Sequence, residues 1–262
     1  MRILLLQSSG RISGNTARAL ALFENALRAE SRRGGETLEL ETVHLAQMDI
    51  RPCMGCRICF TNGEAACPQK DDLLSLKSKM KAADGLVLAG PVYVNDVNGL
   101  MKNWIDRLAH VCHRPEFAGK TALLVATTGA TSVRHTLRTL EVALWTWGFR
   151  ITGTAGLATG AHMLMEEMNR THSATISRAA GRFYQDVRRK GYMKPSFISL
   201  MIFRIQQAGW QKAAADSIDF SFWNDRRWLD TRRCTYFFPH RANPAKVAAA
   251  RAVGSVVAAF MA

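Results

Sequence analysis

The sequence predicts a doubly wound α/β fold, in which parallel strands alternate with helices around one sheet. Three apolar runs support this prediction: residues 3–6, 86–89 and 122–126 each lead into a glycine-containing loop. Unbroken apolar runs of this length are typical of central strands in a parallel sheet. After the first of these loops, residues 17–33 have the periodicity of an amphipathic helix. This helix completes a strand–loop–helix unit.

The remaining elements follow from start and stop signals along the chain. Gly34 and Gly35 end the first helix, and residues 38–43 alternate apolar and polar side chains, as a half-covered strand does. A long insertion over residues 44–71 comes next. Beyond it we expect helices over residues 71–82, 98–112 and 132–147 and a fifth strand over residues 149–158.

Length and composition are those of a globular protein with one main domain and a substantial extension. The chain has 262 residues, of which 48% are hydrophobic and 21% charged, so a large buried core is available. We expect a domain over residues 1–190 and a basic, aromatic-rich helical extension over residues 191–262, packed on that domain or on a partner subunit. No apolar run approaches the roughly 18 residues that span a bilayer, and the start lacks a signal-peptide cleavage pattern, which predicts a cytoplasmic protein.

The positive charge is concentrated in the C-terminal part of the chain. The formal net charge is +14, and residues 178–262 contain 15 Lys or Arg against five Asp. This excess favours anionic partners: a phosphorylated nicotinamide nucleotide, an acidic electron-transfer protein, or an anionic membrane surface contacted peripherally. No nucleic-acid-binding motif accompanies the charge, so nucleic acid is not an expected partner.

The first strand-to-helix loop, residues 7–16, has the composition of an anion-binding site. The first N–H groups of a helix lack intrahelical partners and lie at the positive end of its dipole, so a phosphate satisfies them. The loop adds hydroxyl groups, the charge of an arginine and two glycines, namely Ser8, Ser9, Ser13, Thr16, Arg11, Gly10 and Gly14. It matches neither GxxxxGK[ST] nor GxGxxG, which disfavours a nucleoside triphosphate and a dinucleotide held by the usual fingerprint. An ordinary connection with capping residues is the alternative interpretation.

Two motifs make the chain similar to a known family. Residues 9–16 read SGRISGNT and match the family's SxRxxGNT loop, while residues 83–93 read ADGLVLAGPVY and match its third strand. Lys102 and the pair Asp106-Arg107 follow in the next helix. The chain thus resembles the NADPH-dependent FMN reductase branch of the flavodoxin-like flavoproteins. The resemblance implies FMN as cofactor and a five-stranded parallel sheet of order 2-1-3-4-5, with the ligand beyond the carboxyl ends of the strands.

The resemblance also implies which residues contact FMN. The phosphate would be held by Ser9, Arg11, Ser13, Asn15 and Thr16. The ring would be bordered by Pro91, Val92, Tyr93 and Asn95, and its pyrimidine side by Thr127, Thr128 and Gly129. The resemblance implies an FMN-dependent NAD(P)H oxidoreductase that passes a hydride to a quinone, flavin, nitro or azo compound or another small acceptor. It also implies a homo-oligomer, with a dimer as the expected form. No protein acid or base is required, although Tyr93 could donate a proton rather than serve as an aromatic wall.

A cysteine cluster in the insertion is the second motif with chemical meaning. Cys53, Cys56 and Cys59 form CxxCxxC, and Cys67 follows after seven residues and precedes a proline. Four thiolates so close in sequence suit a [4Fe–4S] cluster, and the spacing resembles the iron–sulfur flavoprotein branch of the same superfamily. Zinc and a metal-free thiol loop are the alternatives. A cluster would favour a different function, an electron carrier that relays electrons between the cluster and FMN.

The C-terminal extension has helical periodicity over residues 195–210 and a last helix that Asn243 can cap, with Pro244 at its first position. Between them, aromatic residues alternate with arginines. The residues Asp219, Trp223 and Trp228 resemble the tail of longer family members. We expect the apolar stripes to be buried, with a lid over the flavin or a membrane-surface patch as the other interpretations.

Overall fold

The structure is a computed structural model that describes residues 1–189 and 194–260. The chain divides into two compact units. The first comprises Met1–Gly55 and Pro68–Arg189, and the second comprises Cys56–Cys67 and Lys190–Ala262. Among the helices in the described ranges, none combines the length and the hydropathy that a bilayer crossing requires.

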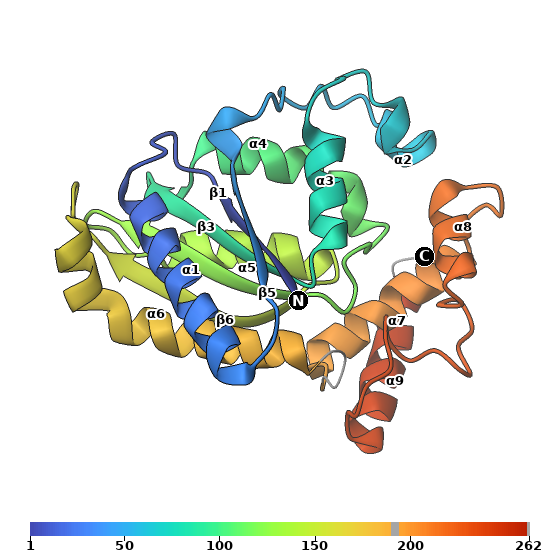
Figure 1. Ribbon diagram of the computed structural model, residues 1–262. Coiled ribbons are helices and arrows are strands. Elements are labelled where there is room, and N and C mark those ends of the chain that lie inside the picture. The colour runs from blue at the N-terminus through green and yellow to red at the C-terminus, as the bar shows by residue number, and fades with distance from the viewer. Residues whose placement is uncertain (190–193, 261–262) are drawn as a thin grey trace. The chain divides into compact units, whose positions relative to one another are not determined.

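The first unit alternates strands and helices along the chain (Figure 1). Its strands are β1 (Arg2–Gln7), β2 (Glu39–His44), β3 (Gly85–Tyr93), β4 (Asp96–Val97), β5 (Thr121–Thr128) and β6 (Arg150–Ala158). Its helices are α1 (Asn15–Gly34), α3 (Leu73–Ala82), α4 (Gly99–Arg107), α5 (Arg134–Thr146) and α6 (Met165–Arg188), with short 3₁₀ helices at Leu45–Gln47 and Ala109–Cys112. The strands and helices expected from the sequence are therefore present.

Two helix boundaries differ from the sequence-based expectation. The helix expected from residue 71 begins at Leu73, because the Asp71 carboxylate accepts the Leu73 N–H (3.1 Å) and so belongs to the preceding turn. The helix expected over residues 98–112 ends at Arg107 and is followed by a separate 3₁₀ helix. Neither difference moves a strand.

In the described residues, the parallel strands of the sheet follow the order β2-β1-β3-β5-β6, and the short β4 pairs with β3. Counted without β4, this is the predicted order 2-1-3-4-5, so the flavodoxin-like fold is confirmed. The central position of β1 is visible at Leu5, which pairs with Thr42 of β2 and Val87 of β3. β2 is added on one side of β1, and β3, β5 and β6 follow on the other side. Ligands of such sheets bind at this switch point between β1 and β3, beyond the carboxyl ends of the strands.

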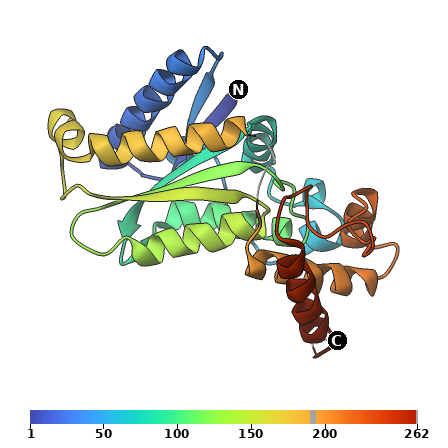
Figure 2. The same cartoon turned by 90° about the horizontal axis from the view of Figure 1, so that it is seen from below.

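Helices cover both faces of the sheet (Figure 2). Alternate residues of β1 point to opposite faces: Ile3 and Leu5 pack with α1 and α6, whereas Leu4 and Leu6 pack with α3, α4 and α5. All four side chains are at most 1% exposed. Gly85 allows α6 to approach β3, since a Cβ there would lie 2.8 Å from Phe183 and Val187.

Residues 92–97, which follow the buried part of β3, form a hairpin that the sequence did not predict. Val92 pairs with Val97 and Tyr93 with Asp96 in antiparallel register, so that only Val94 and Asn95 form the turn. Both have positive φ, 48° and 64°, as a two-residue type I′ turn requires. Such turns normally contain glycine or asparagine, and a β-branched residue with positive φ is an outlier. The absence of a glycine signal explains why the sequence did not predict this hairpin.

The second unit has a small aromatic core of its own. Its helices are α7 (Phe197–Gln211), α8 (Ile218–Asp225) and α9 (Pro244–Phe260), together with α2 (Ile58–Thr61) and a 3₁₀ helix at Glu64–Ala66. The ring of Trp223, fully buried, lies 5.3 Å from that of Trp228 and 5.6 Å from that of Phe203. The Asn243 side chain accepts the N–H groups of Ala245 and Lys246, which confirms the predicted cap of the last helix.

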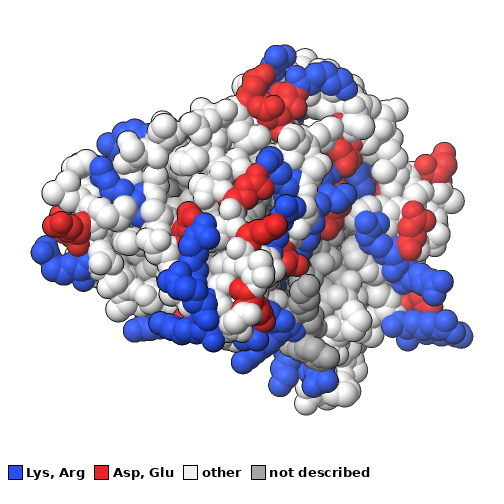
Figure 3. Space-filling model, in the orientation of Figure 1, with Lys and Arg blue, Asp and Glu red and all other residues white. Residues whose placement is uncertain are grey.

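Basic side chains are prominent on the surface, in keeping with the net charge of +14. On the face shown in Figure 3, many Lys and Arg side chains are interspersed with smaller groups of Asp and Glu. In the first unit, Arg32 and Arg33 occupy the last turn of α1 and Arg188 that of α6, where the helix dipole favours positive charge. The anionic partners expected from this charge remain a prediction.

Candidate functional site

The loops that follow β1, β3 and β5 meet at the carboxyl edge of the sheet. Ser8 Oγ donates to the Asn98 side-chain oxygen (2.7 Å), which joins the β1 loop to the segment before α4. The hydroxyl groups of Thr16 and Thr127, also 2.7 Å apart, join the start of α1 to the end of β5. Pro91 pairs with Thr127 between β3 and β5. The three groups of residues that were predicted to contact FMN therefore lie at the same edge of the sheet, although Thr16 and Thr127 are 111 positions apart.

The start of α1 has the features of an anion site. The N-cap Gly14 offers no side-chain cap, and in the described structure the first helical N–H bonded back to the chain is that of Arg18, to the Gly14 oxygen (3.0 Å). The amides of the residues between them, 15–17, therefore lack intrahelical acceptors. The first turn carries no acidic residue, and Arg11 and Ser13 are exposed in the loop in front of it. A phosphate placed here would meet N–H groups, hydroxyl groups and a positive charge.

Gln7, which was not among the predicted site residues, shapes this loop. Its side chain is fully buried at the end of β1, where its oxygen accepts the Ser9 N–H (2.8 Å) and its nitrogen contacts Nδ1 of His44. Ser9 Oγ in turn accepts the Arg11 N–H (3.1 Å). Ser9 therefore contributes to loop conformation through both its amide and its hydroxyl. The signal available in the sequence was a polar residue placed directly after the apolar run of residues 3–6.

The Asn15 side chain connects α1 to the loop after β6. Its nitrogen donates to Thr159 Oγ1 (2.9 Å) and to the Gly160 oxygen (3.1 Å), and its oxygen accepts the Met163 N–H (3.0 Å). The residue is 7% exposed. With the side chain engaged in this way, the contribution of Asn15 to an anion site comes from its backbone N–H.

Replacing Asn15 by Ala should lower the free energy of unfolding of the ligand-free protein by about 1–3 kcal/mol, because buried hydrogen-bonding groups of the β6 loop lose their partner. Urea unfolding followed by circular dichroism measures the change. Asn25→Ala, at an exposed position of the same helix, is the matched control and should change stability little. Equal effects of the two substitutions would contradict the connecting role of Asn15.

The residues expected around the flavin ring differ in exposure. Tyr93 is 52% exposed on the hairpin, and Asn95 is exposed beside it. Thr127 and Thr128 are buried, and Thr128 Oγ1 closes its own loop by accepting the Thr131 N–H (3.0 Å) and donating to the Thr131 oxygen (2.8 Å). Side chains on the β5 side therefore hold the loop, which leaves the backbone near Gly129 to border a ligand.

All of the sequence's six cysteines lie in the described chain, and none forms a disulfide. In the cluster, Cys53 and Cys56 are exposed and Cys59 and Cys67 half-buried. In that fully described loop, the sulfur atoms of Cys56, Cys59 and Cys67 do not all lie within 4.8 Å of one another. A tetrahedral zinc site with bonds of about 2.3 Å needs sulfur atoms about 3.8 Å apart, so these three do not form a ready zinc site.

The backbone of the cysteine loop fits thiolate ligation. Gly55, Arg57 and Gly63 have φ of 66°, 62° and 85°, so the chain turns sharply between successive cysteines. The Gly55 N–H lies 3.5 Å from the sulfur of Cys53, and N–H groups directed at sulfur stabilise a thiolate and tune the potential of iron–sulfur clusters. The donor set is the one expected for a [4Fe–4S] cluster.

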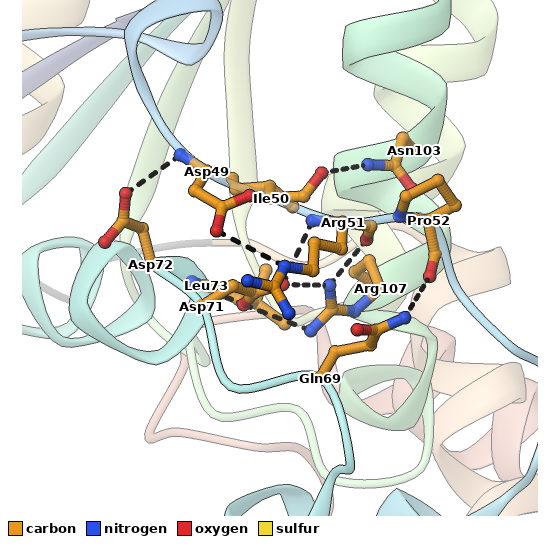
Figure 4. A network of polar contacts seen from close by, with 10 residues as sticks. All are labelled: Asp49, Ile50, Arg51, Pro52, Gln69, Asp71, Asp72, Leu73, Asn103 and Arg107. Atoms are coloured by element: carbon orange, nitrogen blue, oxygen red, sulfur yellow. Dashed lines mark hydrogen bonds and ion pairs between the residues drawn. The ribbon is translucent and has the colours of Figure 1, made fainter.

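The two ends of the cysteine loop are joined by a polar network (Figure 4). At its centre, Arg107 of α4 forms an ion pair with Asp71, and their side chains are only 3% and 1% exposed. Burial raises the pKa of Asp71, but the hydrogen bonds from Arg107, Leu73 and Arg51 and the Arg107 charge outweigh it, so the pKa lies below its usual value. The stabilisation from this carboxylate is therefore present at neutral pH and is lost as the pH falls through the lowered pKa.

The sequence is similar to a known protein family and to several characterised proteins. Residues 1–161 match the family described as NADPH-dependent FMN reductase. An iron–sulfur flavoprotein of Archaeoglobus fulgidus is 27% identical over 235 residues, which cover 87% of this chain and all of that protein. An FMN-dependent NADH:quinone oxidoreductase of Shewanella loihica is 28% identical over 143 residues, 49% of this chain and 70% of that protein.

A solved structure of RosB with the bound intermediate 8-demethyl-8-formylriboflavin-5′-phosphate has a TM-score of 0.57 at 18% identity and covers 72% of this chain and 79% of its own. At this identity the likeness shows the fold alone. The family match, by contrast, spans more than half of the sequence. It contains both the loop between β1 and α1 and the hairpin that follows β3. The chain therefore belongs to the NADPH-dependent FMN reductase family.

Proposed function

We propose that this protein is an iron–sulfur flavoprotein, which binds FMN at the carboxyl edge of the sheet and a [4Fe–4S] cluster in the cysteine loop and relays electrons between them. The single observation that carries the proposal is the presence in one chain of an uncapped α1 start and a loop of four reduced cysteines. The iron–sulfur flavoprotein relative, similar over 87% of this chain, supports the same combination. Of the two functions expected from the sequence, the comparison favours the electron carrier.

The residues that would hold FMN divide by the part of the ligand they meet. The phosphate would be bound by the hydroxyl and guanidinium groups of Ser9, Arg11 and Ser13 and by the N–H groups of Asn15 and Thr16. The ring would be bordered by Pro91, Val92, Tyr93, Asn95, Thr127, Thr128 and Gly129. When bound, FMN and the cluster supply two-electron and one-electron chemistry, respectively. The chain itself would border the ring with these residues and compensate the phosphate charge with the Arg11 guanidinium and the start of α1.

The cluster would be bound by the thiolates of Cys53, Cys56, Cys59 and Cys67. Cys112 and Cys234 stand apart from this set. The sulfur of Cys112 lies 3.4 Å from Thr146 Oγ1. Burial raises the pKa of the Cys234 thiol, which favours the neutral thiol over the thiolate that a metal ligand needs.

A second candidate function is an NAD(P)H oxidoreductase without a cluster. The quinone oxidoreductase relative favours it, and its electron acceptor would be a quinone, a flavin, or a nitro or azo compound stacked on the ring. Tyr93, exposed on the hairpin, would either donate a proton to the acceptor or form one wall of the site. Both candidates share FMN and a homo-oligomeric state; the carrier would exchange electrons with protein partners, whereas the oxidoreductase would reduce a small-molecule acceptor.

Anaerobic purification followed by absorption spectroscopy and by iron, sulfide and flavin analysis tests both candidates. The proposal predicts a brown protein with about four iron and four sulfide per FMN. A yellow, iron-free protein that bleaches when NADPH is added would support the second candidate instead. A colourless protein that does not take up added FMN would overturn both.

A further inference from the structure

The entry and exit of the cysteine loop are held together by polar side chains. We propose that Asp71, Arg107 and Gln69 are positioning residues: they hold the two ends of the cysteine loop together and so lower the conformational-entropy cost of binding a metal at its thiols. The inference deepens the proposed function and rests on its assignment of the cysteine loop as a metal site.

The contacts of Asp71 and Arg107 reach both ends of the loop. On the entry side, the Asp71 carboxylate accepts the Arg51 N–H (3.0 Å), and Arg107 donates to the Arg51 oxygen (2.6 Å). On the exit side, the same carboxylate accepts the Leu73 N–H (3.1 Å). One buried carboxylate and one buried guanidinium thus bond to residues that lie 22 positions apart on the two sides of the cysteines.

Three further hydrogen bonds surround this pair, and Figure 4 shows them with it. The Asp49 N–H donates to the Asp72 carboxylate (2.9 Å), and the Asn103 side chain of α4 donates to the Ile50 oxygen (2.7 Å). The Gln69 side chain donates to the Pro52 oxygen (3.3 Å), immediately before Cys53. The loop base is therefore tied to α4 and across itself at several consecutive residues.

This arrangement is suited to positioning rather than to chemistry. Asp71 and Arg107 are nearly inaccessible, so neither contacts a substrate or supplies a ligand atom. Closing a loop before a ligand binds removes a conformational-entropy cost that the ligand would otherwise have to offset. In characterised metal sites, outer residues that orient the ligands typically change metal affinity by 10–100-fold when they are replaced. The pair is also the usual geometry of a strong arginine–carboxylate contact, in which two N–H groups meet one carboxylate.

The test uses the FMN-loaded, metal-free full chain under anaerobic, reducing conditions, titrated with Co²⁺ and followed by thiolate-to-cobalt absorption. Asp71→Asn should weaken Co²⁺ binding by about tenfold or more. Asp106→Asn is the matched control: it removes an exposed carboxylate that pairs with Lys102, one position from Arg107 on the same helix, and should leave Co²⁺ affinity unchanged. FMN affinity is measured as a control for folding and should be the same in both variants as in the unmodified protein.

The buried Arg107 loses its carboxylate partner in Asp71→Asn, so a milder variant is included. Gln69→Ala removes the hydrogen bond from the Gln69 side chain to the Pro52 oxygen and leaves the ion pair intact. It should weaken Co²⁺ binding by a smaller factor, about threefold. Unchanged Co²⁺ affinity in a folded Asp71→Asn variant would overturn the inference. If that variant fails to fold, unchanged affinity in Gln69→Ala would overturn it. Because cobalt reports on the thiols directly, the result is independent of whether the purified protein contains iron.

Discussion

Replacing Ser13 by Glu is expected to weaken FMN binding by at least about a hundredfold while leaving the protein folded. Ser13 is exposed in the loop directly before the N-cap of α1, so a larger side chain meets no core atom. The added carboxylate would place negative charge where the helix dipole and the N–H groups of residues 15–17 favour a phosphate. Charge-assisted hydrogen bonds contribute about 1.5–3 kcal/mol each, so losing one and adding repulsion yields an effect of this size.

Titration of the flavin-free protein with FMN, followed by quenching of flavin fluorescence, measures this effect at defined ionic strength. Thr175→Glu, which adds the same charge at an exposed position of α6, is the matched control and should bind FMN normally. High salt should reduce the difference between the two variants. If Ser13→Glu binds FMN as tightly as the control, the phosphate is not located at the start of α1.

Replacing Cys56 by Ser is expected to abolish stable incorporation of the iron–sulfur cluster while FMN remains bound. A serine hydroxyl is a poor ligand for a cluster that needs four thiolates, and three remaining cysteines leave one iron without its sulfur. Cys56 is exposed, so the substitution removes no core packing and the fold should be preserved. Iron and sulfide analysis after anaerobic purification should show a loss of nearly all iron with one FMN per chain retained.

Cys112→Ser provides the comparison for this experiment. Cys112 lies outside the four-cysteine loop, half-buried and in contact with Thr146, and its replacement should leave the iron content unchanged. Equal iron loss in both variants would point to general instability rather than ligation. Full iron retention in Cys56→Ser would contradict the assignment of this residue as a ligand.

Much of the first unit was predictable because its signals are local. The apolar runs of β1, β3 and β5 and the glycines that end α1 identify elements without reference to the rest of the chain. The hairpin at Val94 was not predicted, since its turn lacks the usual glycine. The grouping of Cys56–Cys67 with the C-terminal helices was not predicted either, because it depends on contacts between segments about 150 residues apart.

The candidate site was predictable in its location but not in the role of each side chain. The order of the strands places residues 8–16, 91–95 and 127–129 at one edge, as expected. The tasks of Asn15 and Thr127, which bond to other loops of the site, depend on partners more than 100 positions away. Arg107 could be recognised within the Asp106-Arg107 pair, but its contact with Asp71, 36 positions away, became visible only with the structure.

The left-handed conformation of Val94 has a consequence for how easily the tip of the hairpin rearranges. A non-glycine residue in this conformation is usually disfavoured by about 1–2 kcal/mol. The Val94 side chain is 99% exposed, so packing recovers none of this free energy. The free-energy difference between this conformation and other backbone conformations of the turn is thereby reduced. The tip of the hairpin can therefore change its peptide orientation more easily. Adaptability is thus built into the rim of the proposed flavin site by a single β-branched residue.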